Sequence, residues 1–441
     1  MVRAARLNRF EPEVDPRLPG RIRDASAPLR NARDLDPLME RIGDARFVLL
    51  GEASHGTSEY YTWRAEISRR LITEKGFQFI AVEGDWPSCD QLDRSIKGRG
   101  DGDIEEALQA FDRWPSWMWA NAEIAELAEW LKEHNKGRPD QVGFHGLDVY
   151  SLWDSLYAVV GYLRRVDPGA IDAALRAFRC FEPFGEDAQE YARATSRLVP
   201  SSCEDEAIAL LSDIRRKAPA YREDDRWGAF HAEQNALVVR DAEAYYRAMV
   251  RGGPESWNVR DRHMQETLER LARFYGPASR GIVWEHNTHI GDARFTDMAG
   301  DGMVNIGQLA RERWGEDDAL LVGFSTYRGT VIAGNAWDAP AERMSVPEAR
   351  EGSWDELLHR AGGGDKLVLL DGAGPFGETR GQRAIGVVYH PQYENYGNYV
   401  PTDLARRYDA LLFLDETRAL RPLAVPLDLH EEIPETFPSG R

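Results

Sequence analysis

The chain of 441 residues has little of what several large classes of protein require. Its three cysteines, Cys89, Cys180 and Cys203, are odd in number and widely spaced, so we expect neither a disulfide framework nor a zinc site. No apolar run is long enough to span a bilayer. The basic N-terminus lacks the apolar segment of a secretory signal. These absences predict a protein of the reducing cytoplasm that has no membrane partner.

Positive charge is also scarce, because 55 Lys and Arg residues stand against 74 Asp and Glu residues, a formal net charge of −19. A nucleic-acid partner requires clustered Lys and Arg, so we expect none. Hydrophobic residues make up 42% of the chain and aromatic residues 10%, which is typical of a packed globular protein. A small molecule remains as the expected partner, and the choice between monomer and homodimer stays open.

Short apolar runs rich in Val, Ile, Leu and Phe predict strands that are covered on both faces. They are Phe47–Leu50, Phe79–Val82, Val142–Leu147, Ile282–Trp284, Leu320–Phe324, Leu367–Leu370, Ile385–Tyr389 and Leu411–Leu414. Helical patterns separate most of them, as in Ser58–Glu74 and Ala122–His134. This alternation predicts an α/β fold with three layers, α/β/α, around a mostly parallel central sheet.

One block interrupts the alternation. Residues 151–275 show helical periods with many charges and no convincing strand, which indicates a helical insertion or cap between two strands of the sheet. A separate helical domain is the alternative. We therefore divide the chain into an N-terminal part of the core at 1–150, the cap at 151–275, a C-terminal part of the core at 276–429, and an acidic tail at 430–441 that we expect to be frayed.

Four of the predicted strands are followed by at least one ionisable residue, and Trp86 lies beside two of these groups. Glu52 and His55 follow the first, and Glu83, Asp85 and Trp86 follow the second. His145 and Asp148 end the third, and Glu285, His286 and His289 follow the fourth. Ligands bind at the carboxyl ends of the strands in an open parallel sheet, so we expect these groups to meet at one edge.

The pair Glu52 and His55 predicts general-base chemistry. Histidine has an ordinary pKa near neutrality, and a carboxylate beside it fixes its tautomer and stabilises the cation that forms when it takes a proton from water. The start of the next helix, near Thr57–Glu59, would offer backbone N–H groups to a developing oxyanion.

Each of these residues also has a structural interpretation. His55 could satisfy its turn, and Glu83 could cap a helix or form a salt bridge. We expect His145 to be structural, Asp148 to be an N-cap, and one of His286 and His289 to be structural.

Taken together, the motifs resemble those of the erythromycin esterase family from about Phe47 to Leu423. They are LLGEASHGTSEYY at Leu49–Tyr61, VEGDWP at Val82–Pro87, NVRDRHM at Asn258–Met264, WEHNTHI at Trp284–Ile290, GFSTYRGTV at Gly323–Val331, WDAP from Trp337, and IGVVY with the downstream Asn398–Val400. The resemblance implies a helical cap over a cleft and hydrolysis of a carboxylic ester, the type activity being the opening of a macrolide lactone.

The resemblance also assigns roles to residues. It implies that His55 is the general base, Glu52 its carboxylate partner and Glu83 a second glutamate of the cleft. It places Arg260, His286 and the adjacent His289 in the same cleft. We expect the hydrolase to need no cofactor. Glu59, Asp85 and Trp86 lie within or beside the motifs, and with His289 we expect them to contact the substrate. The aromatic segment Trp114–Trp119 either lines the cleft or packs in the core, and core packing is the expectation.

Four other interpretations are weighed. A serine hydrolase would usually carry GxSxG, which the chain lacks, and Ser54 is too close to His55 to form a nucleophile–base pair with it. A metal hydrolase could use Glu52, His55, Glu83, His286 and His289 as ligands, although HExxH is absent. A nucleotide-binding enzyme could use the GxGxxG at Gly372–Gly377, but that motif needs a following helix to bind the pyrophosphate. Here a strand is expected to follow, so we interpret the segment as a loop. A binding or biosynthetic accessory role would keep the cleft but would not need a base.

Overall fold

The computed structural model describes residues 12–99, 103–184, 191, 195, 202–372 and 374–424. Within these residues lies a sheet of nine strands in the order β1-β8-β11-β6-β2-β5-β3-β4, with β7 paired to β6. The strands are β1 (Ser26–Pro28), β2 (Phe47–Leu50), β3 (Phe79–Val82), β4 (Gly143–Gly146), β5 (Gly281–Trp284), β6 (Ala319–Ala333), β7 (Glu342–Val346), β8 (Lys366–Leu369) and β11 (Ala410–Thr417). The predicted tail at 430–441 lies outside the described residues.

The sheet is mostly parallel, as predicted. Strands β11, β6, β2, β5, β3 and β4 run parallel to their neighbours, whereas β8 pairs with β1 and β11 in antiparallel fashion and β7 pairs with β6 in the same way. Residues of β2, β3, β4 and β5 are all buried, which explains the continuous apolar sequences of β2, β3 and β5. The four strands that carry the predicted site are therefore adjacent, in the order β2, β5, β3, β4.

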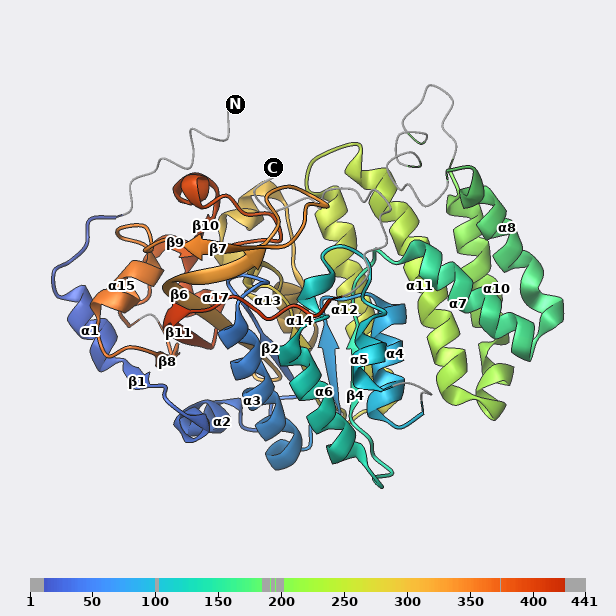
Figure 1. Cartoon of the computed structure of the whole chain (residues 1–441), viewed down its shortest axis with the longest axis horizontal. Coiled ribbons are helices and arrows are strands. Elements are labelled where there is room, and N and C mark those ends of the chain that lie inside the picture. The colour runs from blue at the N-terminus through green and yellow to red at the C-terminus, as the bar shows by residue number, and fades with distance from the viewer. Residues whose placement is uncertain are drawn as a thin grey trace.

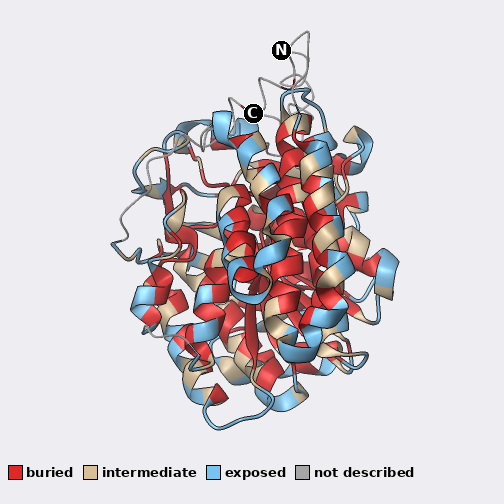
Figure 2. Ribbon diagram, turned by 90° about the vertical axis from the view of Figure 1, so that its right-hand side faces the viewer, coloured by how far each residue is buried: buried red, intermediate tan, exposed pale blue. Residues whose placement is uncertain are grey.

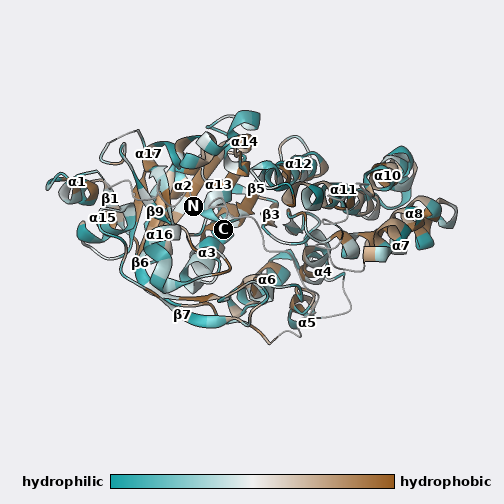
Figure 3. Ribbon diagram, turned by 90° about the horizontal axis from the view of Figure 1, so that it is seen from above, coloured by the Kyte–Doolittle hydropathy of each residue, from teal (hydrophilic) through white to brown (hydrophobic). Residues whose placement is uncertain are grey.

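Helices cover both faces of this sheet (Figures 1 and 3). The helices α3 (Ser58–Lys75) and α6 (Ala122–Asn135) lie on one face, and α12 (Glu255–Tyr275) and α14 (Ile306–Trp314) lie on the other. Each face has its own apolar cluster, one with Val48 and Leu50 and the other with Leu49 and Val283. Figure 2 shows the buried residues along the strands and the inward sides of the helices. The three-layer α/β/α prediction is confirmed.

The remaining elements connect or flank these layers. The helices among them are α1 (Leu18–Asp24), α2 (Asp36–Ile42), α4 (Trp86–Ile96), α5 (Ile104–Leu108), α13 (Asn287–Ile290), α15 (Trp354–Arg360), α16 (Glu394–Gly397) and α17 (Leu404–Arg407). A separate two-stranded sheet pairs β9 (Thr379–Arg383) with β10 (Tyr399–Asp403). No described helix has the length and apolar character needed to cross a membrane.

The predicted strand at Ile385–Tyr389 is wrong. Ile385 and Val388 form only isolated bridges, to Ser54 and Gly334, and the neighbouring strand is β9, which ends at Arg383. Ile385 and Tyr389 are buried in a small apolar cluster with Val331. Their apolar character therefore reflects burial in a loop. The sequence alone could not distinguish a buried loop from a buried strand here, because periodicity does not separate a buried strand from other buried segments.

Between β4 and β5 the described chain is helical. Helices α7 (Leu152–Val166), α8 (Ile171–Phe181), α10 (Glu204–Asp224) and α11 (Arg226–Met249) form their own apolar cluster at one end of the sheet (Figures 1 and 3). Helix α12 follows, but Met264, Leu268 and Leu271 of this helix pack against the sheet. The division into an insertion and a core stays a prediction.

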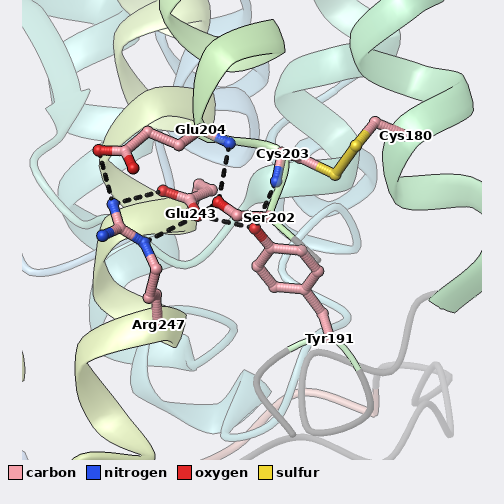
Figure 4. Close-up of a disulfide and its surroundings, with 7 residues drawn as sticks. All are labelled: Cys180, Tyr191, Ser202, Cys203, Glu204, Glu243 and Arg247. Atoms are coloured by element: carbon pink, nitrogen blue, oxygen red, sulfur yellow. Dashed lines mark hydrogen bonds and ion pairs between the residues drawn. A yellow bond between two sulfur atoms is a disulfide. The ribbon is translucent and has the colours of Figure 1, made fainter. Parts of the chain in front are cut away.

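No disulfide framework was expected, but the structure contains one disulfide bond. Cys180 at the end of α8 is bonded to Cys203 at the start of α10, and only Cys89 is a free cysteine among the described residues (Figure 4). The Tyr191 hydroxyl accepts a hydrogen bond from the backbone N–H of Cys203 at 2.9 Å and donates to Glu243 on α11 at 2.7 Å. An odd count with wide spacing does not exclude one bond, because pairing depends on how helices bring distant residues together.

Candidate active site

His55 lies in the turn that joins β2 to α3, and its partner is the one predicted. Its Nδ1 lies 2.9 Å from Oε1 of Glu52, and both side chains are buried. The second oxygen of Glu52 accepts a hydrogen bond of 2.7 Å from Nη2 of Arg64, one helical turn and a half into α3. The carboxylate is therefore held between an imidazole and a guanidinium.

Two glycines make this turn possible. A Cβ atom on Gly56 would lie 1.8 Å from the carbonyl oxygen of Ile332, and one on Gly51 would lie 2.1 Å from the amide oxygen of Asn287. The Gly56 carbonyl also accepts the backbone N–H of Ile332 at 3.0 Å. The glycines that flank Glu52 and His55 thus let the turn pack directly against β6 and α13.

Glu83 follows β3 and is bound by groups from two other segments. Its Oε1 accepts 2.8 Å from Nη2 of Arg260 on α12, and its Oε2 accepts 2.8 Å from the backbone N–H of His286. Nε2 of His289 lies 3.4 Å from Oε1. Burial alone would raise the pKa of the Glu83 carboxyl, but the positive charges of His289 and Arg260 lower this pKa below its ordinary value. Glu83 is therefore favoured as a carboxylate.

Asp148, at the end of β4, is the second carboxylate that binds Arg260. It accepts from Nε at 2.9 Å and from Nη2 at 2.6 Å, a two-point pair with the planar guanidinium. Its Oδ1 also accepts the N–H of Val149, but α7 begins later, at Leu152. The expectation that Asp148 is only an N-cap is wrong, because it orients Arg260.

The imidazole of His286 faces that of His55, with ring centroids 4.9 Å apart. Nδ1 of His286 accepts the backbone N–H of Thr288 at 3.3 Å and lies 2.8 Å from its hydroxyl. A backbone N–H can only donate, so the ring proton of neutral His286 belongs on Nε2. Nε2 is buried and has no hydrogen-bond partner among the described residues. Burial, followed by the charge of His55, lowers the pKa of His286 well below its ordinary value. The ring is therefore neutral with its proton on Nε2, and a hydrogen-bonding interaction with the backbone of Ala53 opposes the fall in its pKa.

His289 is held more tightly than His286. Its Nδ1 lies 3.0 Å from Asp261, and Trp257 stacks on its ring at 4.3 Å. Its Nε2 lies 3.3 Å from Nη1 of Arg260. These contacts place His289 behind Glu83 and Arg260 as a group that supports them.

Glu285, which precedes His286, is buried and neither of its carboxyl oxygens has a hydrogen-bond partner in the part of the chain that the structure describes. Burial raises the pKa of Glu285 well above its ordinary value, and repulsion from Glu83 and Asp261 raises it further. The side chain is therefore a neutral carboxylic acid beside a charged cluster.

A cavity of about 40 Å³ opens beside Glu83 and Arg260. It is lined by Glu83, Gly84, Asp85, Ser88, Phe111, Arg113, Trp114, Pro115, Ser116, Met118, Trp119, Asp148 and Arg260. Trp114 and Trp119 belong to this wall and also to the apolar cluster beneath it. This aromatic segment therefore both lines the cavity and packs in the core.

Asp85 lines this cavity and is paired with Arg113 at 2.7 Å, whereas two other predicted contacts lie elsewhere. Glu59 binds Arg418 at 2.9 Å on the outer side of α3. Trp86 is buried, and its indole donates to Nδ1 of His231 at 2.9 Å. Trp86 also stacks on His145, which bonds the Tyr275 hydroxyl at 2.8 Å, so the expected structural role of His145 is confirmed.

One of the backbone N–H groups predicted as oxyanion donors at the start of α3 already has a hydrogen-bond partner. The Ser58 N–H donates to the Arg418 carbonyl at 2.8 Å, so this donor is already taken. The ring of His286, whose centroid lies 4.9 Å from that of His55, carries the candidate donor instead. Ser54 is buried, and its hydroxyl is hydrogen-bonded to that of Thr57, which leaves the residue in the turn and away from the cavity.

Sequence reasoning missed Arg64, Asp261 and the role of Asp148. Arg64 had a signal, because it falls on the same helical stripe as Tyr60, Ile67 and Leu71, where a charge needs a buried partner. Asp261 is adjacent to Arg260 in the motif NVRDRHM, but its partner on α13 is distant in sequence.

Five side chains had been considered as metal ligands: Glu52, His55, Glu83, His286 and His289. Among the described residues no group of three or more His, Cys, Asp or Glu side chains has the spacing to hold a metal ion. Glu52 is engaged by Arg64, and Glu83 by Arg260. The metal interpretation is left to experiment.

Comparison with known proteins gives a family match. The model of the family described as erythromycin esterase matches residues 72–417. The matched region contains Glu83, Arg260, His286 and His289 and begins after Glu52 and His55. Over 368 residues the chain is 25% identical to erythromycin esterase type II of Escherichia coli, covering 77% of this chain and 84% of that protein.

Solved structures share the fold. A succinoglycan biosynthesis protein has a TM-score of 0.75 at 21% identity, covering 92% of this chain and 98% of that one. An erythromycin esterase mutant in its open conformation has a TM-score of 0.68 at 16% identity, covering 89% of this chain and 97% of that one. At these identities the likeness shows the fold alone.

Proposed function

The chain belongs to the erythromycin esterase family, and from this premise we propose that it is a hydrolase that opens a carboxylic ester or lactone with water activated by His55. The observation that carries the proposal is the contact of 2.9 Å between His55 Nδ1 and the Glu52 carboxylate, with the ring of His286 4.9 Å from that of His55. A histidine that is oriented by a carboxylate can act as a general base.

In the proposed reaction His55 takes a proton from water through Nε2, because Nδ1 faces Glu52. The hydroxide adds to the ester carbonyl, and the Nε2–H of His286 donates to the oxyanion. The tetrahedral intermediate collapses, and the imidazolium of His55 returns its proton to the leaving alcohol. Glu52 stabilises that imidazolium, and Arg64 holds Glu52 in place.

Glu83 positions the attacking water in this scheme. Its lowered pKa favours the carboxylate, which accepts a hydrogen bond but has no proton to give. Arg260 has two of its nitrogens bound to Asp148 and Glu83, so its proposed role is to orient Glu83 at the wall of the cavity.

Macrolide lactones are the first substrates to test, because the relative from Escherichia coli carries the name of an erythromycin esterase. Simple aryl and alkyl esters and smaller lactones complete the panel, since members of one family need not share a substrate. Turnover is followed by the mass of one added water and by incorporation of ¹⁸O from labelled water into the acid product.

His55→Ala should reduce kcat by about a hundredfold to ten-thousandfold. His359→Ala is the matched control, because His359 also contacts a carboxylate, Asp415, at 2.7 Å but lies on α15 away from the site. If the wild type turns over no ester, lactone or amide yet binds a member of the panel, the binding or biosynthetic accessory role replaces the hydrolase.

A further inference from the structure

A second pocket, of about 240 Å³, lies away from the candidate active site. It is lined by Arg222, Arg226, Phe230, Arg270, Arg273 and Phe274, and we call it the arginine pocket. These residues come from the end of α10, the start of α11 and the last turns of α12, which lie side by side in Figure 3. None of them lines the cavity beside Glu83.

Four of the six lining residues are arginines, although the whole chain carries a net charge of −19. Glu233 is shared, since it binds Arg270 at 2.8 Å, Arg222 at 2.8 Å and Arg215 at 3.2 Å. Carboxylates therefore do not neutralise the guanidiniums one for one.

The other two arginines of the pocket have weaker partners. Arg273 lies 3.3 Å from Glu269, and Arg226 donates to the backbone carbonyl of Phe274. Two carboxylates, Glu233 and Glu269, thus face four lining arginines, and four minus two leaves an excess of two positive charges. Asp225, at the α10–α11 turn, accepts the backbone N–H of Gly228.

Arg270 is built into the wall of the pocket with one nitrogen unused. Its side chain is only 9% exposed, its Nε donates to Gln234 at 2.8 Å and its Nη1 to Glu233 at 2.8 Å. Its Nη2 is buried and has no hydrogen-bond partner among the residues that the structure describes. A buried N–H without a hydrogen bond costs free energy, so this fixed guanidinium is expected to donate to an anion that enters the pocket.

Aromatic rings hold the guanidiniums in position. Arg226 lies over the ring of Phe274 at 4.3 Å, and Arg270 over the ring of Phe230 at 5.4 Å. The two rings pack against each other with centroids 4.6 Å apart. The guanidiniums of Arg226 and Arg270 are therefore ordered before any ligand arrives, which reduces the entropy lost on binding.

We propose that the arginine pocket binds a phosphate-bearing small molecule. A phosphate dianion matches the excess of two positive charges, and its tetrahedral oxygens suit the planar fork of arginine. The ligand is a small molecule because the net negative charge of the chain opposes the approach of a long polyanion.

Calorimetry with inorganic pyrophosphate as the probe tests the proposal on the full chain. The wild type should bind one pyrophosphate per chain, and raising the salt concentration should weaken the binding. The double variant Arg226→Gln/Arg273→Gln should weaken it at least tenfold. Arg216→Gln is the matched control, because Arg216 is an exposed arginine of α10 outside the pocket.

His55→Ala separates this pocket from the candidate active site, and it should bind pyrophosphate as the wild type does. Melting curves of the double variant, expected to match those of the wild type without the probe, show that it is folded. Absence of pyrophosphate binding by the wild type overturns the proposal. Equal binding by the double variant, or loss of binding in His55→Ala, does the same by placing the anion elsewhere.

Discussion

The imidazoles of His55 and His286 face each other with their centroids 4.9 Å apart, and they come from the turns that follow the adjacent strands β2 and β5. His55 is held through Nδ1 by Glu52, and His286 is held through Nδ1 by Thr288. Both rings are thereby fixed on one side. In the proposed reaction Nε2 of His55 is the base and Nε2–H of His286 is the donor.

The first prediction removes that donor. His286→Phe should lower kcat about a hundredfold to a thousandfold, with a small change in KM, because the N–H serves the oxyanion more than the bound ester. Steady-state kinetics on the best ester of the panel gives both constants. His286→Gln, which keeps an N–H, should recover part of the loss. Equal losses of kcat in both variants would assign His286 a purely structural role.

The second prediction concerns Arg64, which binds Glu52 at 2.7 Å in a fully buried pair. Arg64→Met should cost about 3–5 kcal/mol in the free energy of unfolding, because it removes the guanidinium partner of a buried carboxylate and leaves only His55 beside it. Urea unfolding measures the loss. The double variant Glu52→Gln/Arg64→Met should lose less than the sum of the two single variants. Arg418→Met, which removes an exposed partner of Glu59, is the control and should change little.

Much of the fold could be predicted from local sequence. Strands β2 and β3 and helix α6 follow from their apolar patterns, and Asn121 caps α6 by accepting the N–H of Ile124. Polar strands could not be found in this way. The sequence TRGQR of β9 shows no apolar alternation. Its conformation depends on pairing with β10 and on the buried contacts of Arg383 with Glu394, which local sequence does not reveal.

The site was predictable as a set of strand ends and not as a network. The convergence of Glu52, His55, Glu83 and His286 follows from the rule that parallel strands end at one edge. The pairing of Arg260 with Asp148 does not, because their approach depends on how α12 packs on the sheet. For the same reason the sequence could not show that Trp86 is turned toward His231 and the interior.

A third prediction uses the raised pKa of Glu285. Above its ordinary pKa the unfolded side chain releases its proton while the folded one keeps it. The unfolded state then binds fewer protons, so this group lowers the stability as the pH rises toward the folded pKa. Glu285→Gln should therefore gain stability over the wild type between pH 5 and pH 8, by at most about 1.4 kcal/mol per pH unit.

Urea unfolding at several pH values across that window measures this difference. Glu129→Gln, on the exposed side of α6, should keep the pH dependence of the wild type. A gain from Glu285→Gln that is the same at pH 5 and pH 8 would mean that Glu285 is ionised in the folded protein.

The fourth prediction addresses the metal alternative. Treating the wild type with EDTA and removing the chelator should leave kcat unchanged, because Arg64 and Arg260 already engage the carboxylates that a metal would need. Elemental analysis of the purified protein should find well under one equivalent of zinc or manganese. Activity that disappears with EDTA and returns with added Zn²⁺ would replace the proposed mechanism with a metal-dependent one at the same site.

The fifth prediction concerns the bond between Cys180 and Cys203, which closes a loop with a sequence separation of 23. Opening a loop of this size should cost about 3 kcal/mol, chiefly because the unfolded chain regains conformational freedom. The bond lies among α8, α10 and α11, whose apolar cluster is separate from the clusters that pack on the sheet. Cys180→Ala/Cys203→Ala should therefore lower the Tm while kcat changes less than twofold, and dithiothreitol should lower the Tm of the wild type but not that of the variant.

Cys89→Ala, which removes the buried free thiol, should keep the response to dithiothreitol. A loss of turnover in the double variant that matches the loss in His55→Ala would show instead that the ordering of these helices is required at the site.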